Sequence, residues 1–275
     1  MNEMPQEMAI LVDETKCTAC RACQVACKQW NQRKAEKTKN LGTYENPPAL
    51  GSQTWMRILF NEDYKNGEMT WRFTKHQCMH CTDASCVEVC PSGATVHEEV
   101  SLPDGNIIRR VRTDPNKCIG CNYCRIACPF SVPGYDQSKK GIFRCTLCAD
   151  RVSNGLIPAC VKACAPGALS FGTRDEMLNK AHARVEELKK AGYADARVYG
   201  ESELNGLKYI YVFTAGADAY GLPVDPKVPF RVSIFKALAK PYGAFATAGL
   251  VIALAVNGII NARNRRLEEK YRLEE

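Results

Sequence analysis

All the cysteines of this 275-residue chain, 16 in number, fall into four compact groups of four. The clearest group runs from Cys118 to Pro129 and reads C-x2-C-x2-C-x3-C-P. In this spacing three thiolates wrap one corner of a cubane iron-sulfur cluster, and the fourth thiolate reaches a second cluster. Gly120 permits the backbone to approach the cluster closely, and Pro129 ends the helical turn that carries the last cysteine. The chemistry that these residues predict is one-electron transfer.

Three further groups repeat or vary this pattern. The group at the N-terminus has the same spacing, the next has two extra residues between its second and third cysteines, and the last has an eleven-residue spacer. In chain order the candidate ligands are Cys17, Cys20, Cys23 and Cys27; Cys78, Cys81, Cys86 and Cys90; Cys118, Cys121, Cys124 and Cys128; and Cys145, Cys148, Cys160 and Cys164. This internal repeat predicts two ferredoxin-like modules that together hold four [4Fe-4S] clusters.

Two other uses of cysteine compete with this interpretation. Disulfides staple distant segments, and the local crowding of these thiols argues against them. Four-thiolate zinc sites remain an alternative for the last group, Cys145 to Cys164, which consists of two cysteine pairs. A mixed histidine–cysteine cluster is conceivable at His76 and His80, but the cysteines already supply complete ligand sets. We therefore expect His76 and His80 either to contact the cysteine ligands without binding iron or to lie at the surface.

The formal net charge of +7 raises the question of an acidic partner. The count treats every cysteine as neutral, whereas an oxidised cluster with four thiolates carries about −2. Four clusters would bring the protein close to neutrality. No basic stripe with interleaved aromatic residues is present, so nucleic acid is not expected as a partner.

The segments around the cysteine runs predict an α+β fold with hairpin insertions. Residues 54–60 with 69–74, and residues 95–100 with 106–112, alternate like paired strands and enclose turn residues. Residues 174–191 form an amphipathic pattern that Thr173 can cap, and residues 207–214 read as a further strand. We expect a cluster domain over residues 1–220 and a connector over 221–240.

The C-terminal part has a different character. Residues 242–262 contain no charge, and a helix of that length would cross a bilayer core of about 30 Å. The sequence therefore predicts a transmembrane helix at 241–262, followed by a charged tail at 263–275. The excess of Lys and Arg after the helix is slight and favours a cytoplasmic C-terminus.

The combined motifs resemble one family, the iron-sulfur beta subunits of membrane-bound bacterial formate dehydrogenases of the N and O types. The resemblance covers nearly the whole chain. The residues that carry it are the Cys17 run, Gln77-Cys-Met-His-Cys, the Cys118 run, Arg144-Cys-Thr-Leu-Cys-x-Asp-Arg-Val, Pro158-Ala-Cys-Val-Lys-x-Cys, the Gly221-Leu-Pro-x-Asp-Pro connector and the C-terminal apolar segment.

The resemblance implies a nested pairing of the runs, the first with the fourth and the second with the third. Spacing alone leaves a pairing of the first run with the second open. In a two-run module each cluster takes three ligands from one run and the fourth from the other. The implied sets are Cys17, Cys20, Cys23 and Cys164; Cys145, Cys148, Cys160 and Cys27; Cys78, Cys81, Cys86 and Cys128; and Cys118, Cys121, Cys124 and Cys90.

The resemblance also implies the role of the chain. A molybdopterin or tungstopterin subunit would oxidise formate, and this chain would relay the electrons to a membrane cytochrome b and quinone without chemistry of its own. The cluster domain would be periplasmic at the inner membrane. An equivalent subunit of a nickel-iron hydrogenase or of another molybdopterin oxidoreductase is the alternative, since similar runs occur there.

Overall fold

The structure is a computed structural model that describes residues 4–65, 67–230, 232 and 240–273. It divides into two units, Met1–Pro229 and Phe230–Glu275, which are described separately. The later part of the predicted connector, residues 231 and 233–239, lies outside the described residues, as does Asn66 in the turn of the first predicted hairpin.

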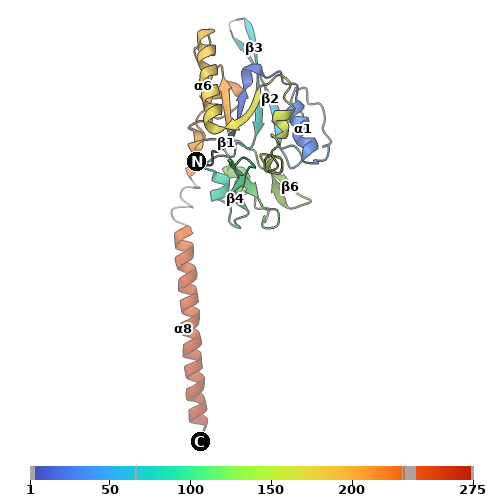
Figure 1. The fold of residues 1–275 in the computed structure, drawn as a ribbon. Helices are drawn as coiled ribbons and strands as arrows, with labels where there is room; N and C mark the ends of the chain where they lie inside the picture. The colour runs from blue at the N-terminus through green and yellow to red at the C-terminus, as the bar shows by residue number, and fades with distance from the viewer. Residues whose placement is uncertain (1–3, 66, 231, 233–239, 274–275) are drawn as a thin grey trace. The chain divides into compact units, whose positions relative to one another are not determined.

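A four-stranded sheet forms the frame of the first unit (Figure 1). Its strands lie in the order β8 (Leu169–Thr173), β1 (Met8–Asp13), β10 (Tyr209–Phe213) and β9 (Arg197–Tyr199). Strand β1 is antiparallel to β8 and parallel to β10. Because β1 precedes the first cysteine run and β8 follows the fourth, this pairing brings the two ends of the cluster region together.

One face of this sheet is covered by α6 (Arg174–Lys190) (Figure 1). The predicted helix and its cap are confirmed: Thr173 and Glu176 form a reciprocal capping box. Apolar side chains at helical spacing on α6 pack against alternate strand residues and form a core without any thiol. Its buried members are Ala9, Leu11, Met177, Ala181, Val185, Leu188, Ala196, Ile210 and Val212.

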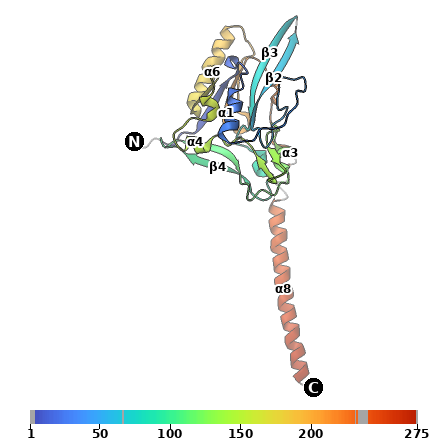
Figure 2. The same cartoon turned by 90° about the vertical axis from the view of Figure 1, so that its right-hand side faces the viewer.

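Three hairpins complete the cluster region. Strands β2 (Met56–Lys65) and β3 (Glu68–Gln77) form a long hairpin that projects from the unit in Figure 2. Strands β4 (Thr95–Ser101) and β5 (Ile107–Thr113) form the second. Both hairpins were predicted, and β2 and β3 extend beyond the predicted ranges. The short pair β6 (Gly134–Asp136) and β7 (Gly141–Phe143) was not predicted.

Short helices carry many of the cysteines, and the turns before them repeat. In all four runs the residue directly before the second cysteine has a positive φ, which lets the chain curl around a common centre. These residues are Ala19, His80, Gly120 and Leu147. The helices are α1 (Ala22–Trp30), α2 (Ser85–Glu88), α3 (Tyr123–Ala127), α4 (Ala149–Val152) and α5 (Ala159–Lys162), and the 3-10 turns are η1 (Glu14–Lys16), η2 (Glu203–Asn205) and η3 (Ala217–Tyr220).

The second unit contains α8 (Lys240–Leu273), a helix of 34 residues. It covers the segment for which a helix was predicted. The predicted membrane crossing by residues 242–262 is not supported, since no helix in the described ranges combines the length and apolarity that a span requires. Asn257 and Asn261, hydrogen-bonded to each other at 3.3 Å, place amide groups within the apolar run and make it less apolar.

Candidate iron-sulfur sites

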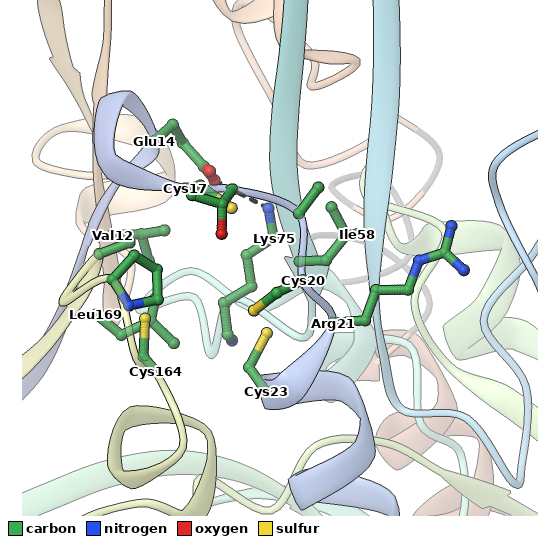
Figure 3. A pocket seen from close by; sticks show the side chains of 14 residues that line it. Val12, Glu14, Cys17, Cys20, Arg21, Cys23, Ile58, Lys75, Cys164 and Leu169 are labelled. Atoms are coloured by element: carbon green, nitrogen blue, oxygen red, sulfur yellow. Dashed lines mark hydrogen bonds between the residues drawn. The ribbon is translucent and has the colours of Figure 1, made fainter.

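The first candidate site is a cavity of about 370 Å³ in which thiols from the two ends of the cluster region meet (Figure 3). Its walls contain Cys17, Cys20 and Cys23 from the first run and Cys164 from the fourth. Strand β1 leads into this first run, and Cys164 comes just before β8, which pairs with β1. The pairing of these two strands therefore positions the four thiols around one space.

The second candidate site is a cavity of about 300 Å³ between the same two runs. The thiols that line it are Cys27, Cys145, Cys148 and Cys160. The backbone N–H of Leu147 donates to Cys145 Sγ at 3.3 Å, and the hydroxyl of Tyr209 lies 3.6 Å from the same sulfur. Such donors stabilise negative charge on a ligand sulfur.

Burial makes these thiols hard to ionise by themselves. Desolvation raises the pKa of Cys17 and of Cys23 to about 12, and neighbouring thiols add to the shift. Desolvation likewise raises the pKa of Glu14, which lines the first cavity, to about 8. Thiolates are stable in such surroundings only when bound to cations, so the donor set fits the iron ions of a cluster.

The zinc alternative for the last run required Cys145, Cys148, Cys160 and Cys164 to face one ion. The structure separates them, because Cys164 lines the first cavity and the other three line the second. In the part of the chain that the structure describes, no three or more His, Cys, Asp or Glu side chains converge closely enough to hold a single metal ion. All 16 cysteines are free thiols.

The second and third runs come together around a smaller core. Burial raises the pKa of Cys81 well above its usual range, and the nearby thiols of Cys78, Cys128 and Cys86 raise it further. Cys81 and Cys128, both half-buried, pack against the large core that contains Cys78. Cys86 belongs to the small core, against which Cys81 also packs.

The last set has the same exposure as the first, with one exposed, one buried and two half-buried thiols. Burial raises the pKa of Cys124 to about 11, and its neighbours include Cys118 and Cys121, the latter exposed to solvent. Cys90 Sγ accepts the backbone N–H of Thr95 at 3.3 Å. Helix α2, which ends just before Cys90, packs against α3, which contains Cys124.

His76 and His80, which lie beside Cys78 and Cys81, are both buried. The alternative that they lie at the surface is therefore wrong. His80 Nδ1 accepts the backbone N–H of Val111 at 3.0 Å. His76 Nε2 lies 2.9 Å from the carbonyl oxygen of Phe130, to which it donates. Each ring therefore fixes a backbone segment next to a cysteine run.

Two buried cations near the thiols were missed in the sequence. Lys75 lines both cavities of the first and fourth runs, and Arg144 donates to Cys86 Sγ at 3.1 Å. Each lies shortly before the first cysteine of a run, at Cys78 and Cys145, and that position was the only available signal.

Two family models match the chain, both described as a 4Fe-4S dicluster domain. One matches residues 16–94 and the other residues 69–174. Two matches to two-cluster domains support four [4Fe-4S] clusters. The first match spans the first and second runs, whereas the cavities join the first run to the fourth. The cavities show which thiols face one another, and they group the first run with the fourth.

These matches and sites define the class of the protein, a ferredoxin-like iron-sulfur protein that transfers electrons. Curated relatives narrow the class. The chain is 40% identical over 253 residues to the "Formate dehydrogenase, nitrate-inducible, iron-sulfur subunit" of Escherichia coli (strain K12), covering 90% of this chain and 82% of the relative. It is 35% identical over 277 residues to the "Formate dehydrogenase-O iron-sulfur subunit" of the same organism, covering 99% and 90%.

A further relative is "Formate dehydrogenase 2 subunit beta (cytochrome c-553)" of Nitratidesulfovibrio vulgaris, 37% identical over 185 residues, which is 66% of this chain and 83% of the relative. The chain belongs to the family of formate dehydrogenase iron-sulfur subunits. It is therefore an electron-transfer subunit of an enzyme complex.

Proposed function

We propose that this chain relays electrons, one at a time, through four [4Fe-4S] clusters held by the nested ligand sets. The observation that carries the proposal is the pair of cavities in which thiols of the first and fourth runs face each other. The outer module, from residues 17–27 and 145–164, would hold one cluster on Cys17, Cys20, Cys23 and Cys164 and one on Cys145, Cys148, Cys160 and Cys27. The inner module, from residues 78–90 and 118–128, would hold one on Cys78, Cys81, Cys86 and Cys128 and one on Cys118, Cys121, Cys124 and Cys90.

The clusters supply one-electron redox chemistry at closely spaced sites. The chain itself supplies the thiolates, buries seven of the 16 cysteines and donates backbone N–H groups to sulfur. The bonds from Leu147 to Cys145 and from Thr95 to Cys90, both 3.3 Å, are of this kind. Donors of this type favour the reduced, more negative state of a cluster.

The proposed electron donor is a molybdopterin or tungstopterin subunit that oxidises formate to carbon dioxide, one proton and two electrons. The proposed acceptor is a membrane cytochrome b, which passes two electrons and two protons to a quinone. The resemblance of the whole chain to the N and O types supports both partners, and the names of the relatives support the formate-oxidising one.

We place the complex at the inner membrane, with the cluster unit on the periplasmic side. The support is the resemblance to membrane-bound formate dehydrogenases. The proposal assigns membrane attachment to the cytochrome partner that this resemblance implies. Membrane fractions of cells that lack the cytochrome subunit should lose this chain, and its retention there would contradict the assignment.

The experiment is formate reduction of the complex purified in mild detergent. Formate should elicit the electron paramagnetic resonance signals of reduced [4Fe-4S] clusters, and a variant with an inactive catalytic subunit should show them only with dithionite. This chain alone, with its clusters intact, should not reduce a dye with formate. Formate oxidation by the chain alone, or reduction by hydrogen with a co-purified nickel-iron subunit, would overturn the proposal.

A further inference from the structure

Lys75 is a cation enclosed between the two outer sites. It is 2% exposed and contributes to the walls of both cavities. Figure 3 shows it among the thiols of the first site. Its Nζ donates to Gln77 Oε1 at 2.9 Å and lies 4.3 Å from the centre of the Tyr209 ring. The nearby carboxyl of Glu14 accepts the backbone N–H of Lys75, at 2.9 Å, rather than pairing with the ammonium group.

Lys75 faces thiols of both outer sites. In the first cavity it shares the wall with Cys20 and Cys23. In the second cavity it shares the wall with Cys27 and Cys145. One ammonium group therefore faces both thiol sets of the outer module.

Arg144 holds the equivalent place in the inner module. It is 5% exposed, and its Nη1 donates to Cys86 Sγ at 3.1 Å. Cys86, a proposed ligand of one inner site, shares a small core with Cys124, a proposed ligand of the other. The Nε and Nη2 of Arg144 are buried without a hydrogen-bond partner. Buried unpaired donors are costly, so these groups point to an acceptor such as the sulfur of a cluster.

Each of the two cations lies on a chain segment that leads into one module but faces the sites of the other module. Lys75 lies near the end of β3, the strand that leads to Cys78 of the inner module, yet it faces the outer sites. Arg144 directly precedes Cys145, a ligand of the outer module, yet it contacts the inner thiols. Each module thus receives its buried positive charge from the chain segment that enters the other module.

We propose that Lys75 and Arg144 are positioning residues that raise the reduction potentials of the outer and inner cluster pairs, respectively. This inference rests on the proposed ligand sets. Reduction adds one electron to a cluster without making or breaking a bond, and a fixed positive charge in a poorly solvated interior favours the more negative product. Because each cation faces two sites, its effect is shared within one pair.

The test is a redox titration followed by electron paramagnetic resonance on the complex purified with its partner subunits. Lys75→Met and Arg144→Gln remove the charges, and Lys75→Arg and Arg144→Lys keep them. Lys189→Met, on the half-exposed face of α6, controls for the loss of a lysine. Iron and sulfide contents are measured first. A wild-type complex without four clusters would refute the proposed function, and this result is distinct from unchanged potentials in a complex that holds all four.

We expect Lys75→Met to lower two of the four midpoint potentials and Arg144→Gln to lower the other two. Each shift should be at least tenfold in the equilibrium constant for reduction, which is about 59 mV for one electron. The charge-preserving variants should show smaller shifts confined to the same pairs. If a neutral variant assembles fewer clusters, the potentials of Lys75→Arg and Arg144→Lys test the proposal instead. Unchanged potentials, a uniform shift of all four, or an effect of both residues on the same pair would overturn the proposal.

Discussion

The outer and inner modules both position eight cysteines, but they differ in how much sheet, helix and apolar core surrounds these cysteines. The outer sites adjoin a four-stranded sheet whose far face is covered by α6, and that core contains no cysteine. The inner sites adjoin a small core in which two of the five buried side chains, Cys86 and Cys124, are proposed ligands. The inner ligand Cys78 belongs instead to the large core that also contains the outer ligands Cys23 and Cys145. The outer module therefore has a frame that hydrophobic burial can hold, whereas the part of the inner module around Cys86 and Cys124 depends on its clusters.

This difference teaches how stability and function are divided. In a small core, burial of apolar area contributes little, and bound metal can supply the missing folding free energy. Exposure of the thiols does not separate the modules, because each contains one exposed cysteine, Cys20 in the outer module and Cys121 in the inner module.

Removal of iron should reveal the largest difference in stability between the two modules. Chelation under mild acid should abolish amide protection in β4, β5 and α3, because the inner core loses its metal-bound thiols. Amides of β1 and β10 should stay protected. Hydrogen exchange read by mass spectrometry measures both regions, and equal loss of protection in the two modules would contradict the account.

Met177→Ala tests the frame of the outer module. Met177 is fully buried between α6 and the sheet, so its truncation should lower the opening free energy of α6 amides by about 4 kcal/mol. Met69→Ala, at an exposed position of the long hairpin, is the matched control. A similar loss of protection around Cys124 would mean that the two cores are not independent.

Gly134→Ala tests the loop contact beside the inner module. A methyl group there would lie 2.1 Å from the carbonyl carbon of Gly51, and neither backbone can yield easily. We expect destabilisation of the β6–β7 hairpin by about 3 kcal/mol. Gly141→Ala in the same hairpin meets its nearest atom at 3.6 Å and should be nearly neutral. A shift in thermal stability that is equal for both variants would argue against this contact.

Thr173→Ala should have the smallest effect. It removes half of the capping box of α6 and should cost about 1 kcal/mol, visible as faster exchange in the first turn of the helix. Thr173→Ser keeps the cap and should behave like wild type. Faster exchange in α3 as well would weaken the distinction between the modules.

Much of this architecture could be predicted from the residue pattern. The cysteine runs, both long hairpins and α6 follow from local spacing, turn residues and helical periodicity. Lys75 was not predicted, because a lysine in an alternating strand ordinarily points to solvent, and its burial depends on Tyr209 from a distant strand. Arg144 was named as part of a family motif, but its contact with Cys86 joins segments 58 residues apart and could not be predicted from local spacing.

The grouping of the runs is a property of the sheet. Spacing left two pairings open, and the contact of β1 with β8 favours one of them. The membrane crossing at 242–262 was predicted from the absence of charge and from the length of the segment. Asn257 and Asn261 lie within this segment, and their amide groups make it less apolar.

The most direct test of the nested ligand sets is the iron content of paired variants of Cys164 in the purified complex. Cys164→Ser alone should cost one cluster, about four iron atoms. If Cys164 shares a cluster with Cys17, the double variant Cys17→Ser with Cys164→Ser should lose no more iron than the single one. Cys145→Ser with Cys164→Ser should lose about eight iron atoms, since two clusters are affected. The reverse pattern would contradict the joining of the first run to the fourth.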